Sequence, residues 1–374
     1  MNTRKTLASL TAMATLFTMA ACAAPDKESD TTTESGVDAS TATSAEDFGG
    51  LDELVKAAQD EGELNVIALP PDWANYGEVI SAFEATYDIE VNSDQPDAAS
   101  QDEINAANDL KGTARAPDVF DLGQSVALAN TDLFAPYQVE TWDDIPAEFK
   151  DADGTWVNDY GGYMSIGYDS AVVPEVTSLS DLLKPEFKGK VALNGDPTQA
   201  GAAFSGVMMA AIANGGSADD VAPGVDFFTE LKEAGNFLTV DPDSTTIEQG
   251  TTPVVIDWDY LGAAAAANVD TWKTVVPEEA VVAGYYFQAI NADAPNPAAA
   301  RLWQEFLYSD EGQNLWLEGG ARPVRGDAMA EAGTIDAELW GALPEVSGDP
   351  VVPTDDQTVT AGEYLAANWS KAIR

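Results

Sequence analysis

The stretch Leu64-Asn65-Val66-Ile67-Ala68-Leu69 is almost wholly apolar, and a loop, an amphipathic segment at 76–87 and the short run Ile89-Glu90-Val91 follow it. In the amphipathic segment the apolar residues recur at helical spacing. A buried strand, a loop, a helix and a second strand in this order are typical of a mostly parallel α/β sheet. Strand-like runs recur at 117–122, 190–193 and 253–257. The sequence therefore predicts an α/β fold.

The loops that follow these strands are the first candidates for a functional site. Ligands of open α/β sheets lie beyond the carboxyl ends of the strands. Four loops occupy such positions, at 70–75, 123–125, 194–199 and 257–260. The first and the last of them carry aromatic and acidic side chains together, which a loop that only turns the chain does not need.

Length and composition limit both the size of the fold and its chemistry. With 374 residues, 45% of them hydrophobic, the chain can form two domains with substantial cores. It contains no histidine, which excludes the Ser-His-Asp and Cys-His nucleophile systems and removes the commonest transition-metal ligand. Neither an EF-hand calcium loop nor a Walker-type phosphate loop occurs. We therefore expect a protein that is not an enzyme and that holds no cofactor and no resident metal.

The charge balance is strongly acidic. A formal net charge of −47 repels nucleic acid and anionic lipid, and it draws cations toward clefts. We expect no nucleic-acid partner. An adaptation of the whole surface to solubility or to salt would explain most of these acids, so the total charge does not by itself identify a ligand.

The N-terminus is typical of an exported protein. Arg4 and Lys5 precede an uncharged run at 7–19, which is too short for a membrane-spanning helix of roughly 20 residues. The sequence Met19-Ala20-Ala21-Cys22 then resembles the lipobox of bacterial lipoproteins, in which the cysteine is lipidated. The resemblance implies a signal peptide at 1–21 and a lipid anchor at Cys22. The alternative is a plain secretory signal with an incidental cysteine.

The segment that follows the cysteine is predicted to be a disordered acidic tether at 22–49. Small polar and acidic residues dominate it, so it can bury little surface. A flexible chain of this length would span roughly 25–30 Å and would hold a folded body clear of a membrane. The expected location is therefore the cell membrane, outside the cytoplasm, either extracellular or periplasmic. Because Cys22 is the only cysteine, no disulfide can form within the chain.

The order of segments in the folded part resembles the extracellular solute-binding proteins of bacterial ABC importers, of the family 1 and family 6 type. The likeness is to the group that includes receptors for polyamines, ferric iron, thiamine and phosphonates. It covers roughly residues 50–330 and lies in segments that match in order, at 64–66 with 78–91, 116–121, 182–191, 296–313 and 322–324.

This resemblance implies a periplasmic-binding-protein (type II) fold of two α/β lobes, with a cleft between them. The two crossing segments would lie near 163–168 and 283–290, which gives lobe one as 50–165 plus 286–374 and lobe two as 166–285. A small-molecule solute would close the lobes, and an ABC permease in the membrane would recognise the closed monomer. We expect a C-terminal helix at 361–373 to pack on lobe one.

The sequence Ile256-Asp257-Trp258-Asp259-Tyr260 is the sharpest local indication of the ligand. Two carboxylates and two rings follow an apolar strand, which suits an organic cation through charge pairing and cation–π contact. Polyamine receptors are similar here. Further candidates lie on the facing lobe and at the first crossing. The predicted ligand-binding residues are Asp72, Trp73, Tyr160, Tyr163, Asp257, Trp258, Asp259 and Tyr260.

Several alternatives stay open at this stage. Trp258 could pack in the core and Asp257 could cap a helix. Ferric receptors usually have two adjacent tyrosines where Asp259-Tyr260 stands, whereas Tyr285-Tyr286 falls at the second crossing and is interpreted as hinge packing. A phosphonate or phosphate ester could bind at 196–201 with Arg322 or Arg325. Outside this class, the chain could be a secreted carboxylate hydrolase or a passive surface lipoprotein.

Overall fold

The computed structural model describes residues 36–344, 346 and 350–373. The predicted signal peptide, Cys22 and the first part of the predicted tether lie outside these residues. Within the described part of the chain, no helix combines the length and the apolar character needed to cross a membrane.

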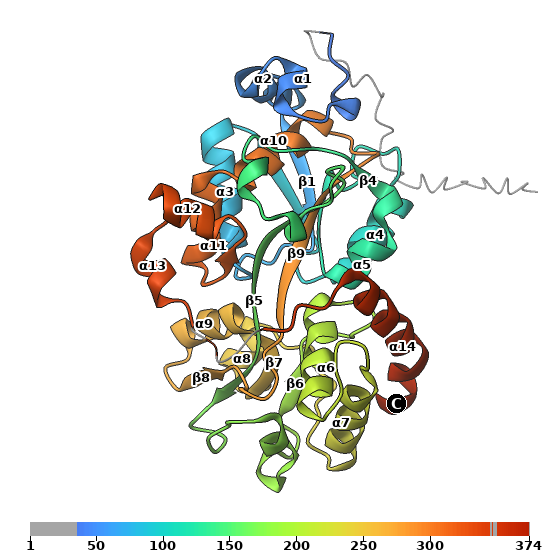
Figure 1. Cartoon of the computed structure of the whole chain (residues 1–374), viewed down its shortest axis with the longest axis vertical. Helices are drawn as coiled ribbons and strands as arrows, with labels where there is room; N and C mark the ends of the chain where they lie inside the picture. The colour runs from blue at the N-terminus through green and yellow to red at the C-terminus, as the bar shows by residue number, and fades with distance from the viewer. Residues whose placement is uncertain (1–35, 345, 347–349, 374) are drawn as a thin grey trace, which may run out of the picture.

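Two lobes lie one above the other, and two long strands run between them (Figure 1). These strands are β5 (Val157–Asp169) and β9 (Ala283–Asn291), which pair antiparallel from Val157 to Tyr163. From Met164 onward β5 pairs instead with strands of the second lobe. The predicted α/β fold with two lobes and two crossing segments is therefore confirmed.

Lobe one contains the chain up to the first half of β5 together with the later elements from β9 to α13 (Ala337–Ala342). β1 (Glu63–Ile67) and β2 (Glu90–Asp94) pair in parallel and are joined by α3 (Tyr76–Tyr87), as the strand–helix–strand pattern predicts. The main sheet of this lobe combines β5 and β9 with three further strands, β3 (Val119–Leu122), β4 (Phe134–Ala135) and β10 (Arg322–Pro323). The other helices of the lobe are α1 (Ala45–Phe48), α2 (Leu51–Glu61), α4 (Ser100–Asp109), α5 (Gln124–Ala129), α10 (Pro297–Leu307), α11 (Asp310–Glu318), α12 (Gly326–Ala332) and α13 (Ala337–Ala342).

Lobe two is built on the second half of β5. Its other strands are β6 (Val191–Leu193), β7 (Val254–Trp258) and β8 (Trp272–Val275). Its helices are α6 (Gly201–Ala213), α7 (Ala222–Glu233), α8 (Ser244–Glu248), α9 (Asp259–Asn268) and α14 (Asp355–Ile373). The sequence of α6 is apolar nearly all round, which is typical of a helix enclosed by other elements, and its residues are mostly buried.

The predicted tether is wrong in its second part, because residues 36–49 fold onto lobe one. Four apolar side chains there, from Ala39, Ala42, Ala45 and Phe48, are buried in the main core. Arg301 of α10 fixes the segment, since its guanidinium donates hydrogen bonds to the carbonyl oxygens of residues 40, 42 and 297. The average composition of the segment hides these regularly placed apolar residues, and composition was the only basis for the prediction.

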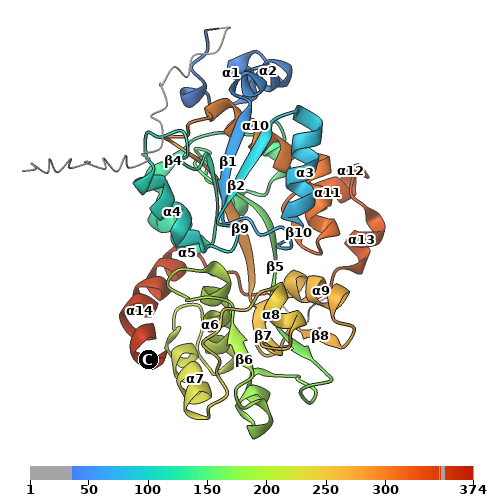
Figure 2. The ribbon, with the colours of Figure 1, turned by 180° about the vertical axis from the view of Figure 1, so that it is seen from behind.

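The C-terminal helix packs on both lobes, against α7 of lobe two and α5 of lobe one, and not on lobe one alone as predicted. The ring of Trp369 in α14 meets that of Phe228 in α7 at 5.3 Å, and Lys232 donates a hydrogen bond to the carbonyl of Ala372. Figure 2 shows α14 running beside α6 and α7, with its first turn near α5 of lobe one. The predicted lobe-one range of 286–374 therefore ends in a helix that bridges the two lobes.

Candidate ligand-binding site

A cavity of about 510 Å³ lies between the two lobes. This volume is within the usual range for a small-molecule site. Lobe one contributes the loops after β1 and β2, the start of α4 and the end of β3. Lobe two contributes the loop after β6, the start of α6, a segment at 241–248 and the inner side of α9. A solute in this cavity would contact both lobes.

The lining of the cavity is acidic. Nine of its residues are Asp or Glu, and none of the described lining residues is Lys or Arg. Two of these acids, Glu103 and Asp121, are 1% and 7% exposed, and Asp257 is partly buried. The other six lie at the exposed rim, at Asp72, Asp97, Asp196, Asp241, Asp243 and Glu248. With its low-dielectric walls, such a cavity concentrates cations.

The two loops of lobe one that reach the cavity hold strained backbone. Ala68, Ala74 and Asn75 after β1 have φ values of 60°, 44° and 70°, and Gln95 after β2 has a φ of 43°. The left-handed region costs a non-glycine residue roughly 1–2 kcal/mol. Strain of this kind persists where the surrounding structure imposes it, and it often occurs at ligand sites.

Glu103 and Asp121 form the buried end of the cavity. Glu103 Oε2 accepts a hydrogen bond of 2.9 Å from the backbone N–H of Asp121. Asp121 Oδ2 accepts hydrogen bonds of 2.8 Å from the hydroxyls of Tyr76 and Tyr160. Burial raises the pKa of Asp121 to about 7, although the two tyrosine hydroxyls oppose the rise. Burial, and then the neighbouring Asp121 charge, raise the pKa of Glu103.

On the side of lobe two, Asp257 faces the cavity from the end of β7. Its Oδ1 accepts a hydrogen bond of 2.8 Å from the N–H of Trp258, and its Oδ2 accepts one of 2.7 Å from the Asn194 side chain. Burial raises the pKa of Asp257 to about 7. Because α9 has Trp258 at its N-cap position, Asp257 precedes the cap and does not occupy it.

Three of the eight predicted ligand-binding residues line the cavity, namely Asp72, Trp73 and Asp257. Asp259 turns away and accepts hydrogen bonds from the N–H groups of Tyr163 and Tyr260, which ties the crossing strand to α9. Four aromatic candidates are also absent from the described lining, namely Tyr160, Tyr163, Trp258 and Tyr260. Trp73 lines the cavity and Trp258 does not, so the two rings do not face each other across the site.

These aromatic side chains pack together beside the cavity. The ring of Trp73 lies 6.2 Å from that of Tyr260 and 5.6 Å from that of Tyr286, in edge-on contacts, and its N–H donates to the Tyr160 hydroxyl. Trp258 stacks on Tyr260 at 6.3 Å and meets Tyr286 edge-on at 6.4 Å. The core-packing alternative for Trp258 agrees with this position. Because Trp73 and Tyr260 belong to different lobes, their contact is part of the interlobe interface.

The lining residues that the sequence prediction missed include Glu103, Asp121, Asn194 and Tyr286, and of these four only Asn194 lay in a candidate loop. Two signals were available for the acids. Glu103 shares the buried face of α4 with Ile104 and Ala107, where an acid is unexpected. Asp121 interrupts an otherwise apolar strand. Tyr286 lines the cavity, whereas its neighbour Tyr285 packs against Phe149 with a ring separation of 4.5 Å.

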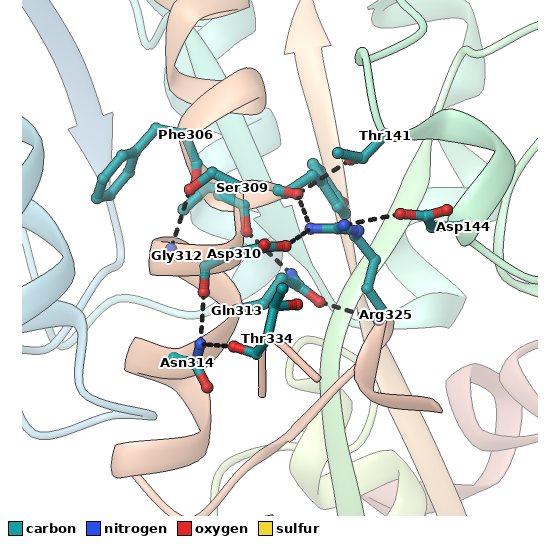
Figure 3. A network of polar contacts seen from close by, with 12 residues as sticks. Thr141, Asp144, Phe306, Ser309, Asp310, Gly312, Gln313, Asn314, Arg325 and Thr334 are labelled. Atoms are coloured by element: carbon teal, nitrogen blue, oxygen red, sulfur yellow. Dashed lines mark hydrogen bonds and ion pairs between the residues drawn. The ribbon is translucent and has the colours of Figure 1, made fainter. Parts of the chain in front are cut away.

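The two arginines considered for an anionic ligand are engaged elsewhere in lobe one. Figure 3 shows Arg325 directed at Asp144 and Asp310, with hydrogen bonds of 2.7 and 3.0 Å. It also donates to the carbonyl of Tyr308. Arg322 lies over the ring of Tyr163 at 4.7 Å. Neither arginine lines the cavity.

The cavity acids predict how the stability of the empty protein depends on pH. The folded-state pKa values of Asp121 and Asp257, about 7, lie above the value of about 3.9 for an unfolded aspartate. The folded state therefore holds more protons between about pH 4 and 7, and the free energy of unfolding falls as the pH rises through this window. Asp257→Asn should reduce the loss of Tm between pH 5.5 and pH 8.

Calorimetric melts of the two proteins at both pH values measure this difference. Asp97→Asn is the matched control, because Asp97 lies at the exposed rim of the same cavity. We expect its pH dependence to follow that of the unchanged protein. If Asp257→Asn followed it too, burial of Asp257 would not control this part of the pH dependence.

Comparison with solved structures places the fold among periplasmic binding proteins. AfuA from Actinobacillus pleuropneumoniae, with fructose 6-phosphate bound, is 17% identical with a TM-score of 0.63, over 83% of this chain and 98% of that one. A ferric-binding protein from Campylobacter jejuni is 18% identical with a TM-score of 0.61, over 83% and 99%. The spermidine/putrescine substrate-binding protein PotD from Streptococcus pneumoniae is 17% identical with a TM-score of 0.53, over 83% and 99%. At these identities the likeness shows the fold alone.

Sequence comparison identifies the family. A search of curated protein sequences found no significant match. The sequence model of the family described as bacterial extracellular solute-binding protein matches residues 117–346, which is more than half of the chain. This match and the two-lobed fold agree, and the chain belongs to the bacterial extracellular solute-binding protein family.

Proposed function

We propose that this protein is the receptor of an ABC importer for a small organic cation such as a polyamine. Proteins of the family deliver small solutes to ABC permeases from outside the cytoplasm. The observation that carries the choice of solute is the lining of the interlobe cavity, which has nine carboxylic acids and, among its described residues, no basic side chain. A cation entering this cavity exchanges part of its hydration for several charged partners.

The arrangement of the acids supports capture by closure. Glu103 and Asp121 belong to lobe one and Asp257 to lobe two. A cation between them attracts both lobes, so its affinity is higher for the closed state than for the open one. Only such a difference in affinity can shift the population toward closure.

One feature of the cavity favours an anion, namely the N-terminus of α6 at Gly201 and Ala202. A helix N-terminus has the effect of roughly half a positive charge. Nine acids outweigh it, which argues against a sugar phosphate or a phosphonate. For a metal ion, no group of three or more His, Cys, Asp or Glu side chains is arranged as a ligand set within the described residues.

The attachment of the receptor rests on the sequence alone. We propose that Cys22 carries a lipid that holds the protein at the outer side of the cytoplasmic membrane, and that the receptor acts as a monomer. Mass spectrometry of the native N-terminal peptide tests the first statement. A peptide that begins at Cys22 with a diacylglyceryl mass is expected, and an unmodified cysteine would refute the anchor.

Isothermal titration calorimetry tests the proposed solute class. We expect putrescine or spermidine to bind with one site per protein, and we expect fructose 6-phosphate and ferric citrate to give no heat of binding. Raising the salt concentration should weaken the interaction, because it screens the rim acids. Binding of the sugar phosphate or of iron, with no response to either amine, would overturn the proposal.

A further inference from the structure

Two carboxylate oxygens at the buried end of the cavity have no partner. Glu103 Oε1 and Asp121 Oδ1 are both inaccessible to solvent, and neither accepts a hydrogen bond within the described part of the chain. Their side chains are 1% and 7% exposed, and both residues line the cavity. A buried acceptor that lacks a donor costs free energy, so such a pair calls for a ligand group that supplies donors.

The second oxygen of each acid is already used within the protein. Glu103 Oε2 is held by the backbone of β3, and Asp121 Oδ2 is held by two tyrosine hydroxyls. Tyr76 is itself held by the amide of Gln288. These bonds hold one oxygen of each carboxylate and leave the other oxygen without a partner. Because both unpartnered oxygens are closed to solvent in this structure, a ligand group reaches them only when the lining of the cavity shifts.

The surroundings of the pair show which kind of ligand group fits. Tyr76, Asp159 and Tyr160 face the two acids from within lobe one, while Asp257 and Tyr286 lie on the cavity side. Among the described cavity residues there is no positive charge that could satisfy the pair. A hydrogen-bond donor that also carries positive charge would satisfy the pair and displace any proton that the two acids hold.

We propose that Glu103 and Asp121 form a head-group subsite that selects a nitrogen cation bearing N–H bonds, such as a primary ammonium, amidinium or guanidinium, over a quaternary ammonium. This inference rests on the proposed function and specifies its ligand. One N–H bond of the head group reaches Glu103 Oε1 and another reaches Asp121 Oδ1.

The distinction follows from hydrogen bonding and not from charge. A quaternary ammonium has the same charge but no N–H bond, and it leaves both oxygens without a donor. Sites for quaternary ammonium instead surround the cation with aromatic faces. Here Trp73 and Tyr286 meet each other edge-on, and their rings are partly occupied by contacts with Tyr160 and Tyr260.

A matched pair of probes tests the subsite on the unchanged protein. Putrescine and its permethylated analogue, in which each nitrogen carries three methyl groups, have the same carbon chain between the nitrogens and the same two charges, and they differ in whether the nitrogens bear N–H bonds or methyl groups. Calorimetry should show putrescine binding at least tenfold more tightly, and agmatine, which carries a guanidinium, should also bind. Equal affinities for putrescine and the permethylated analogue would overturn the proposal.

A matched pair of variants locates the effect. Glu103→Gln keeps the shape and the acceptor for the Asp121 N–H, and it should weaken putrescine binding at least tenfold and reduce the preference over the permethylated analogue. Glu331→Gln removes an exposed acid outside the cavity and should change affinity by less than about threefold. Equal losses in the two variants would refute the subsite while the cation receptor stands. Binding of fructose 6-phosphate or ferric citrate in place of every amine would refute both.

Discussion

Replacing Gly123 with alanine will weaken solute binding by about 5- to 150-fold while leaving each lobe folded. Gly123 precedes α5 in lobe one, and Gly201 begins α6 in lobe two. A Cβ atom on Gly123 would lie 2.5 Å from the Cα of Gly201, and one on Gly201 would lie 2.7 Å from the Cα of Gly123. Both obstructing atoms are backbone, so neither can rotate away.

The added Cβ of Gly123→Ala costs free energy at the contact between the lobes and not within lobe one. Gly123 has φ and ψ values of −63° and 144°, which alanine adopts without strain. Forcing an extra carbon into a closed contact costs about 1–3 kcal/mol, which corresponds to the stated loss of affinity if binding requires closure. The apparent affinity falls in proportion to the population that can close.

Calorimetry with putrescine measures the loss, and small-angle scattering with and without putrescine shows whether the lobes still approach. Gly362→Ala in α14 is the control, because a Cβ there meets no atom within 4 Å. If the Gly123→Ala variant bound putrescine as tightly as the control variant, ligand capture would not need the contact between Gly123 and Gly201.

Arg325→Met will lower the free energy of unfolding by about 3 kcal/mol. The Arg325 side chain is 5% exposed and forms ion pairs with Asp144 and Asp310, as well as a hydrogen bond to the Tyr308 carbonyl. Removing one partner of a buried ion pair costs about 3–5 kcal/mol, because the remaining charges lose their compensation. The two aspartates are about half exposed and can be hydrated, which places the cost at the lower end of this range.

Urea unfolding monitored by tryptophan fluorescence measures this change. Arg115→Met is the control, since Arg115 pairs with Asp94 at 3.5 Å and both side chains are well exposed. Exposed pairs contribute at most about 1 kcal/mol, so the control should remain close to the unchanged protein. Similar losses in the two variants would mean that the buried network in Figure 3 adds no stability of its own.

The sequence predicts the fold well because its strands are separate apolar runs with helices between them. It predicts the site only in part, because a side chain's direction depends on where an element ends. Asp257 ends β7 and faces the cavity, whereas α9 begins at Asp259, whose carboxylate bonds back to the Tyr163 N–H. Asp257 therefore lines the cavity, whereas Asp259, two positions later, has a structural role.

Other differences between sequence and structure have a similar physical origin. Helical periodicity shows that α14 has an apolar face, but it does not show which lobe that face meets. Glu103 was overlooked because an acid on a helix usually faces solvent, and the packing of α4 against β3 shows that it is buried with Ile104 and Ala107. In both cases the missing information is a contact between distant parts of the chain.

The two ends of the described chain belong to different lobes. The segment at 36–48 is fixed to lobe one by Arg301, and the last turn of α14 is fixed to lobe two through Trp369. Any rotation of one lobe against the other must therefore change the separation of these ends. A donor and an acceptor dye attached at these two ends would report solute binding as a change in energy transfer, with no need to place a label near the binding cavity.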